Sequence, residues 1–373
     1  MEIKKILIIP SSKIVQPIKR GIVNNILKVV RDFKLKLKPN FFVYDGEMLF
    51  YSDIPRILGK ENVFILDKYY PYLLLRNTPD NCPYPVFANN PEATFIGQEK
   101  IKNTLNKVDV VLVSTRSGSK GQAVVKDARQ KNIPIVMIDF HDHDEIFASV
   151  NIKKDCFRGF IKGKDFDIYF KKDIPLGYKS EILFPLSPLP VRVEAFKKLI
   201  MVKDINIFYS GRSRIDLCQP DREESISVIK KNFKNLKILE HETRKTFPTR
   251  KKYWEYISRS KIAVSPSGRV WDSFRHCEIG LANKTALAIP KPYVETIGPD
   301  LKDGVNSILY DIKIKDGRAH LINEKEFKDK LNYYLNSKIE RERLADRWTE
   351  DVKNGHTVYA RSKYIIKTIE KIF

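Results

Sequence analysis

Short, continuously apolar segments that alternate with helix-patterned segments most constrain what this 373-residue chain can fold into. Residues 5–9, 62–66, 108–113 and 133–138 are apolar runs of strand length, and a helical pattern over 122–131 separates the last two. Strands that are apolar on both faces and joined by helices are typical of a parallel sheet with helices on both sides. We therefore predict an α/β fold.

The same alternation restarts after a proline-rich segment. Residues 184–190 contain three prolines, which is typical of an interdomain linker because proline interrupts helices and central strands. A new apolar run at 205–209 opens the second series, and a helical pattern over 357–372 closes it. We predict two Rossmann-like, doubly wound domains that face a cleft, with a last helix that crosses back to the first domain. The predicted parts are residues 1–186, 187–352 and 353–373.

The composition is strongly basic. Lys and Arg number 68 against 46 Asp and Glu, which gives a net charge of +22. Such a charge favours polyanionic partners: nucleic acid, an anionic membrane surface, a glycan or a phosphorylated small molecule. No apolar window is long enough for a transmembrane helix, and the N-terminal apolar run is too short for a signal peptide. The four cysteines form no CxxC pair, which argues against a zinc knuckle and fits a reducing compartment. We expect a cytoplasmic protein, with peripheral binding at the inner membrane face as an open alternative.

Three turns of the second series carry groups suited to a phosphorylated ligand. Ligands of parallel sheets bind beyond the carboxyl ends of the strands, where backbone N–H groups and arginine forks can hold phosphate oxygens. An exposed basic turn, a surface loop and a carboxylate that caps a helix are the alternative interpretations. The third turn places an acid at a predicted helix start. The candidate residues of the three turns are Gly211, Arg212 and Arg214; Ser267, Gly268, Arg269 and Arg275; and Glu278.

Taken together, these turns resemble the donor-binding domain of the GT-B glycosyltransferases of the "group 1" type. The resemblance covers mainly residues 203–340 and rests on a Gly-Arg turn, a Ser-Pro-Ser loop, the Glu-Ile-Gly-Leu-Ala segment 278–282 and the turn 303–311 that contains Asn306. It implies that Glu278 binds the nucleotide ribose, that the arginines neutralise the departing diphosphate, and that Asn306 belongs to the donor site. Many retaining members carry a glutamate about seven residues before the ribose-binding one. Here position 270 is Val, so the stereochemistry stays open.

An acidic and histidine-rich segment follows the strand at 133–138 in the first series. His141, Asp142, His143 and Asp144 could supply a catalytic base beside an acceptor, since a neighbouring carboxylate polarises an imidazole. The same residues could bind a divalent metal ion, or they could form a polar loop with no function. The resemblance argues against a metal, because the family holds the diphosphate with arginines and a helix terminus.

The function predicted from these observations is sugar transfer from a nucleotide-diphosphate-sugar donor to an acceptor hydroxyl, with no metal and no cofactor apart from the donor. The acceptor would be a glycan, a lipid-linked glycan or DNA. Two alternatives stay open: a metal-dependent phosphoesterase or hydrolase that uses His141 and His143, and a nucleic-acid-binding protein without catalytic activity.

Overall fold

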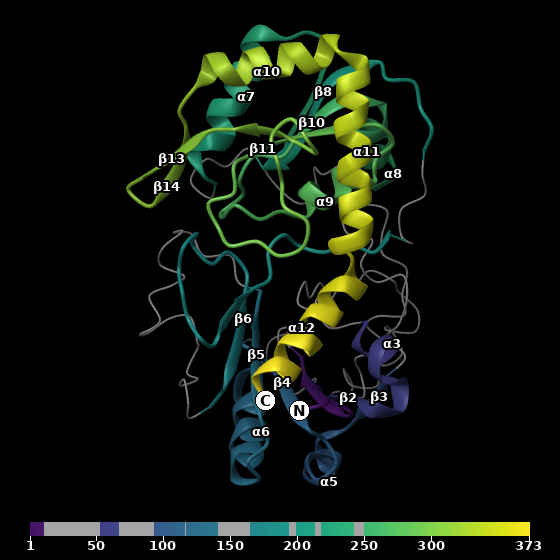
Figure 1. Ribbon diagram of the computed structural model, residues 1–373, viewed down its shortest axis with the longest axis vertical. Coiled ribbons are helices and arrows are strands. Elements are labelled where there is room, and N and C mark those ends of the chain that lie inside the picture. Colours follow the sequence, from purple (N-terminus) through teal and green to yellow (C-terminus); the bar gives the residue numbers. More distant parts are fainter. Residues whose placement is uncertain are drawn as a thin grey trace, which may run out of the picture. The chain divides into compact units, whose positions relative to one another are not determined.

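The computed structural model describes residues 1–10, 53–66, 93–115, 117–140, 165–193, 199–212, 218–241 and 250–373 (Figure 1). These residues form two compact units. The first takes in the described residues up to Phe140, residues 165–170 and Ser362–Phe373, and the second takes in those of Lys171–Arg361. No helix among them is long and apolar enough to span a bilayer.

The N-terminal part of the chain builds a seven-stranded sheet in the order β3-β2-β1-β4-β5-β6-β7. The pairs β3–β2, β2–β1, β1–β4 and β4–β5 are parallel. The central strands are buried along their whole length, as their apolar runs predicted. The strands are β1 (Ile6–Ile9), β2 (Val63–Leu66), β3 (Thr94–Ile96), β4 (Val110–Ser114), β5 (Ile135–Asp139), β6 (Ile168–Lys171) and β7 (Leu183–Pro185). The helices of the first unit include α3 (Ile54–Leu58), α5 (Ile101–Leu105) and α6 (Gly118–Gln130).

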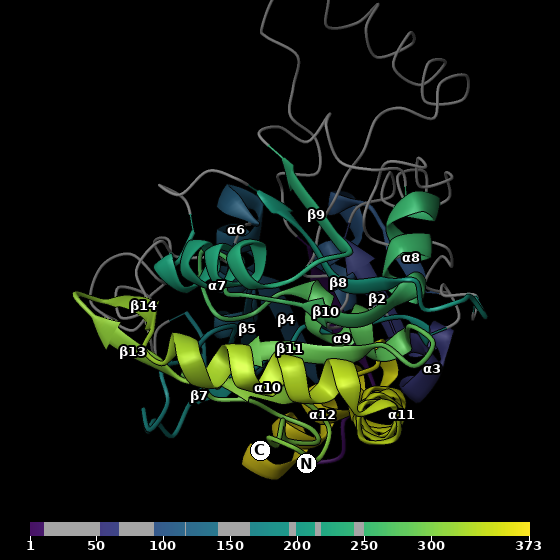
Figure 2. The same ribbon diagram turned by 90° about the horizontal axis from the view of Figure 1, so that it is seen from above.

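The second unit contains a five-stranded parallel sheet in the order β12-β11-β10-β8-β9, and Figure 2 shows β9, β8, β10 and β11 side by side. Tyr209, Val264 and Ala288 face one layer of helices, whereas Phe208, Ala263 and Leu287 face the other. The strands are β8 (Ile205–Arg212), β9 (Leu236–His241), β10 (Ser260–Val264), β11 (Ala286–Pro290) and β12 (Ile308–Tyr310). The first layer holds α7 (Pro220–Asn232) and α10 (Glu324–Asn336), and the second holds α8 (Arg250–Arg259), α9 (Phe274–Leu281) and α11 (Lys338–Gly355).

The α/β class with two series of parallel strands is therefore confirmed. The last helix, α12 (Val358–Ile372), also agrees with the prediction, because its residues from Ser362 onward belong to the first unit. The amino group of Met1 donates to the carbonyl of Glu370, and the N–H of Ile3 donates to the carboxylate of Glu370 at 3.2 Å. The rings of Phe170 and Tyr364 meet edge to face.

Two predictions from the sequence were incomplete. The proline-rich linker begins as an edge strand, β7, where a proline is tolerated because one side of the strand needs no partner. An antiparallel hairpin, β13 (Ile312–Lys315) and β14 (Arg318–Leu321), follows β12 and was not predicted. Its strands are short and partly exposed, so they have no continuous apolar run, although Asp316-Gly317 at its turn is a hairpin signal.

Gly280 lets α9 pack closely against α11. A Cβ atom at this position would lie 2.7 Å from Val352 Cγ2 and 2.9 Å from the Trp348 ring, whose Nε1 is held by the carbonyl of His276. We expect Gly280→Ala to lower the free energy of unfolding by about 1–3 kcal/mol, because the Trp348 ring cannot move without losing this bond. Gly268→Ala is the control, since its Cβ would find no atom closer than 3.6 Å. Urea unfolding of both variants gives the comparison, and equal stability of the two would contradict the prediction.

Candidate functional site

The carboxyl edge of the five-stranded sheet brings two of the three predicted turns together. Arg275, the second residue of α9, donates from Nη1 to the carbonyl of Ser210 at the end of β8, at 2.6 Å. Its guanidinium carbon lies 5.9 Å from the centre of the Tyr209 ring. Gly211 is the next residue of β8. A positively charged group of the second turn therefore lies directly beside the first turn.

Several candidate residues lie outside what the structure describes. For Arg212 it describes the backbone alone, and Arg214 is outside the described residues. The four candidates of the first domain, His141, Asp142, His143 and Asp144, are also outside them. Within the described residues no cluster of three or more His, Cys, Asp or Glu could hold a metal ion. The structure therefore leaves the proposed base and the metal alternative at 141–144 as predictions.

A buried histidine fixes the loop that follows β10. Ser265 Oγ lies 2.8 Å from His276 Nδ1, and His276 Nε2 lies 2.9 Å from the carbonyl oxygen of Trp271. Burial lowers the pKa of His276 to about 3, so the imidazole is neutral. Because a carbonyl oxygen can only accept, we assign the proton to Nε2, and Nδ1 accepts from the Ser265 hydroxyl. Trp271 Nε1 in turn donates to the carbonyl of Pro290 on β11 at 3.1 Å.

The Ser267–Gly268 turn in this loop is bound to the start of α7. The N–H of Ser267 donates to Asp221 Oδ2 at 3.2 Å, and Arg222 Nε donates to the carbonyl of Ser267 at 2.9 Å. A Cβ atom on Gly268 would lie 3.6 Å from Arg222 Nη2, so the guanidinium runs alongside the turn. Arg222 therefore adds a buried positive charge that was not predicted. The sequence around it gave only one signal, a proline at the first position of a helix.

Glu278 is buried in the body of α9 and not at its start. It is the fifth residue of the helix and 2% exposed, while Ser273 provides the N-cap. The interpretation of Glu278 as a helix cap is therefore wrong. The Tyr253 hydroxyl on α8 donates to Glu278 Oε2 at 3.0 Å, and the Tyr253 ring packs against Phe208 of β8. A buried carboxylate needs such donors, since burial of the charge without them is costly.

Asn306 is not brought together with the other candidates. Its Oδ1 accepts from the N–H of Lys302 at 2.7 Å, and its Nδ2 donates to the Asp300 carbonyl and to Asp351 Oδ2, both at 2.8 Å. The side chain is 2% exposed. It orders the turn before β12 and attaches this turn to α11.

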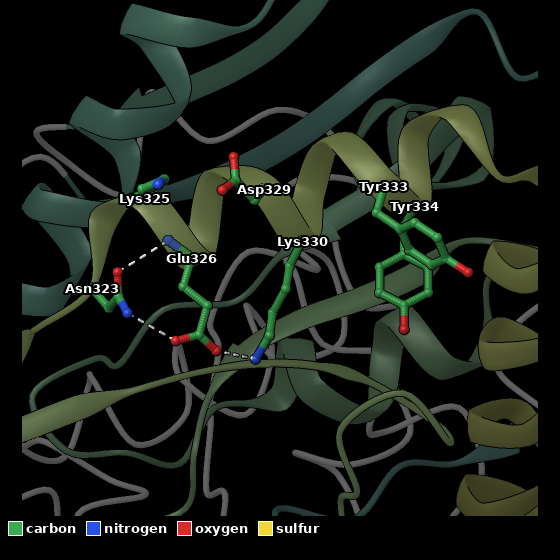
Figure 3. Close-up of a pocket in the computed structure, with 7 residues that line it drawn as sticks. All are labelled: Asn323, Lys325, Glu326, Asp329, Lys330, Tyr333 and Tyr334. Atoms are coloured by element: carbon green, nitrogen blue, oxygen red, sulfur yellow. Dashed lines mark hydrogen bonds and ion pairs between the residues drawn. The ribbon is translucent and has the colours of Figure 1, made fainter.

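A surface cavity of about 470 Å³ lies along α10 (Figure 3). Asn323 and Glu326 cap the helix reciprocally, and Lys330 bonds to Glu326 and to Asp303, each at 2.8 Å. Asn323 and Glu326 thus order the start of α10, and Lys330 attaches the helix to the turn before β12. None of the predicted site residues lines this cavity; the lining residues are Asn323, Lys325, Glu326, Asp329, Lys330, Tyr333 and Tyr334.

Comparison with solved structures identifies the fold. Anabaena Alr3699/HepE in complex with UDP matches at a TM-score of 0.54 and 9% identity, over 98% of this chain and 100% of that chain. The same protein in complex with UDP-glucose matches at 0.54 and 10% identity, over 98% and 99%. The chain has a GT-B fold. No family model and no curated protein matches the sequence, and identities of 9–10% establish the fold alone.

Buried imidazoles make the stability of this GT-B chain fall in acid. Burial lowers the pKa of His276 and of His356 to about 3 from the ordinary 6.5, so the unfolded chain binds more protons between these values. We expect the free energy of unfolding to fall as the pH drops from about 6.5 towards 3, and His276→Gln to make this fall shallower. Asp221 contributes with the opposite sign, because burial raises its pKa from 3.8 to about 6. Urea unfolding at pH 7, 6, 5 and 4 gives the free energy of unfolding of the parent chain and of His276→Gln. If this free energy depends on pH in the same way in both, the prediction that His276 is buried in its neutral form is wrong.

Proposed function

We propose that the protein is a glycosyltransferase that uses a nucleoside diphosphate sugar, with a UDP-sugar as the first donor to test. The observation that carries the proposal is the convergence of Arg222, Arg275 and the Ser267–Gly268 turn at the carboxyl edge of a parallel sheet. Ligands of such sheets bind at this edge. Alr3699/HepE, which shares the fold, has been solved with UDP and with UDP-glucose.

In this proposal the positive groups at the edge bind the donor diphosphate. The acceptor hydroxyl attacks the anomeric carbon, its oxygen forms the new bond, and the bond between that carbon and the diphosphate oxygen breaks. The nucleoside diphosphate leaves with the bonding electrons. Guanidinium groups fixed in advance stabilise the charge that develops on the leaving oxygen. Arg269 comes from the loop after β10 and Arg275 from α9. Arg212 is the last residue of β8, and Arg214 comes two residues later in the sequence.

Glu278 is the proposed ribose-binding residue. A carboxylate has about four lone-pair positions, so it can accept from Tyr253 and from ribose hydroxyls at the same time. His141, Asp142, His143 and Asp144 are the proposed sources of the base that takes the proton of the acceptor hydroxyl, if the reaction inverts the anomeric centre. We propose that no metal takes part.

The acceptor is proposed from charge. A net charge of +22 favours an acceptor that is itself polyanionic or lies on an anionic surface. An acidic glycan, a lipid-linked glycan at the inner membrane face and DNA meet this condition. We would measure the rate of sugar transfer to each of these three acceptor classes at 50 and 200 mM salt. Binding to a polyanion weakens steeply with salt, so transfer to a polyanionic acceptor should be slower at the higher salt concentration.

The Glu278 proposal predicts a loss of donor affinity. Glu278→Gln keeps the size of the side chain but removes the charge that strengthens hydrogen bonds from the ribose. We expect the Kd for UDP-glucose, from isothermal titration calorimetry, to rise about 10-fold or more. Glu240→Gln is the matched control, since Glu240 lies at the end of β9 at the same edge and pairs with Lys230 at the surface. If both variants bind like the parent chain, Glu278 has no part in the donor site.

A substitution of Arg275 should weaken the binding of UDP and leave the binding of uridine unchanged. In Arg275→Lys a single ammonium replaces the planar guanidinium that now donates to the Ser210 carbonyl. We expect the Kd for UDP to rise about 5- to 20-fold and the Kd for uridine to stay unchanged, because uridine carries no phosphate. The control is Arg259→Lys, since Arg259 pairs with Asp204.

The alternative function, a metal-dependent hydrolase, is tested by measuring UDP binding with and without EDTA. Loss of UDP binding on chelation would indicate a metal site.

A further inference from the structure

Asp221 is a buried carboxyl group to which the proposed reaction gives no task. It is the second residue of α7 and is fully buried. Its Oδ2 accepts from the N–H of Ser267 at 3.2 Å and from the Tyr310 hydroxyl at 3.0 Å. These partners lie 46 and 89 residues further along the chain. One carboxylate oxygen thus connects the first turn of α7 to the loop after β10 and to the end of β12.

The peptide groups of Ser267 are held from both sides by neighbouring residues of α7. Asp221 accepts from its N–H, and Arg222 donates to its carbonyl oxygen. A substitution at Asp221 would therefore release one side of the turn and leave the other side bound. This separates the role of the carboxylate from that of the guanidinium.

Gln219, just before α7, holds the next two residues of the turn. Its N–H donates to the carbonyl of Gly268 at 2.8 Å, and its side-chain amide donates to the carbonyl of Arg269. We call Gln219, Asp221 and Arg222 the α7 clamp. The clamp fixes three consecutive carbonyl groups and one N–H of the loop, so the backbone of this loop is ordered without a ligand.

We propose that Asp221 is a positioning residue of the donor site: its carboxylate holds the Ser267–Gly268 turn in the geometry that receives the donor, and donor affinity depends on its ionisation. The inference rests on the proposed function. A loop that is already ordered loses less entropy when ligand binds, and this raises affinity. Hydrogen bonds to an ionised acceptor are roughly twice as strong as bonds to a neutral one. Protonation of Asp221 should therefore loosen the turn.

The surroundings of Asp221 allow this protonation near neutral pH. Burial raises the pKa of the carboxyl to about 6. Its second oxygen, Oδ1, is buried and has no hydrogen-bond partner, so a proton can reside there while Oδ2 continues to accept. Protonation therefore weakens the hydrogen bond from the Ser267 N–H to Oδ2 but does not break it.

The charged groups on the elements packed against α7 have partners of their own, and the two tyrosines beside Asp221 stay neutral. Burial raises the pKa of Tyr293 and Tyr310 well above 10, so both stay neutral. From β14, Arg318 donates to the Cys218 carbonyl, and His320 pairs with Glu224 at 2.9 Å. From α10, Lys330 is bound to Asp303 and Glu326. The charged and titratable groups that act on Asp221 are Arg222 on α7, Tyr310 on β12 and Tyr293 after β11. Arg222 in turn lies beside Cys218 and Tyr209.

The test compares donor binding across pH in matched variants of the full chain. Asp221→Asn keeps the shape and one acceptor oxygen but cannot ionise, Asp221→Ala removes the acceptor, and His320→Gln controls for the nearby imidazole. The probe is UDP-glucose, because the terminal phosphate of UDP itself titrates near pH 6. Isothermal titration calorimetry at pH 7.5, 6.5 and 5.5 gives the Kd, and the melting temperature of each variant is measured at the same pH values.

We expect the parent chain and His320→Gln to bind UDP-glucose roughly 3- to 10-fold more weakly at pH 5.5 than at pH 7.5. Asp221→Asn should bind at all three pH values with the weaker affinity, and Asp221→Ala more weakly still. A parent profile that is flat, or an Asp221→Asn profile with the parent slope, overturns the inference and leaves the proposed function intact. A change in melting temperature without a change in Kd overturns it in the same way. If the parent chain binds no sugar nucleotide at any pH, both proposals fall.

Discussion

The hydrogen-bond register of the five-stranded parallel sheet is the constraint on which the candidate site depends. Ala263 is paired with Phe208 on one side and with Leu287 on the other, so the ends of β8, β10 and β11 reach the same edge. The contacts of Arg275 with Ser210 and of Ser267 with Asp221 cross between segments that this register brings together. Because Ala263 lies opposite Phe208, the loop that leads from β10 to Arg275 leaves the sheet close to Ser210, and Arg275 can reach the Ser210 carbonyl.

Burial of polar groups at this edge gives it both rigidity and electrostatic character. His276, Asp221 and Glu278 lie almost completely out of water, and each is held by hydrogen bonds from a different element. Burial favours the uncharged forms of the imidazole and of the Asp221 carboxyl. Arg222 and Arg275 supply guanidinium groups at this edge. The net result is an edge where positive charge faces a preformed loop.

The sequence could predict those features that depend on local pattern. Continuous apolar runs identified the central strands, and the Glu-Ile-Gly-Leu-Ala segment drew attention to Glu278. Asp221 and Tyr253 were missed, because an acid in a first helical turn and a tyrosine in an amphipathic helix are ordinary locally. Their roles arise from partners 25 to 89 residues away, which only the register of the sheet determines. The hairpin β13–β14 was missed because its short strands lack an apolar run.

The divergence from Alr3699/HepE indicates which parts of such a site can persist. At 9–10% identity almost every side chain differs, yet the structural match covers 98% of this chain and 99–100% of that chain. Strand ends, turns and helix starts offer backbone N–H groups that do not depend on side-chain identity. The diphosphate of the proposed donor can be received by such geometry. An acceptor offers no such common group, so its recognition must rest on side chains that are particular to this chain. In the proposed reaction, a shared fold can therefore suggest how the donor is bound, whereas the acceptor has to be identified by experiment.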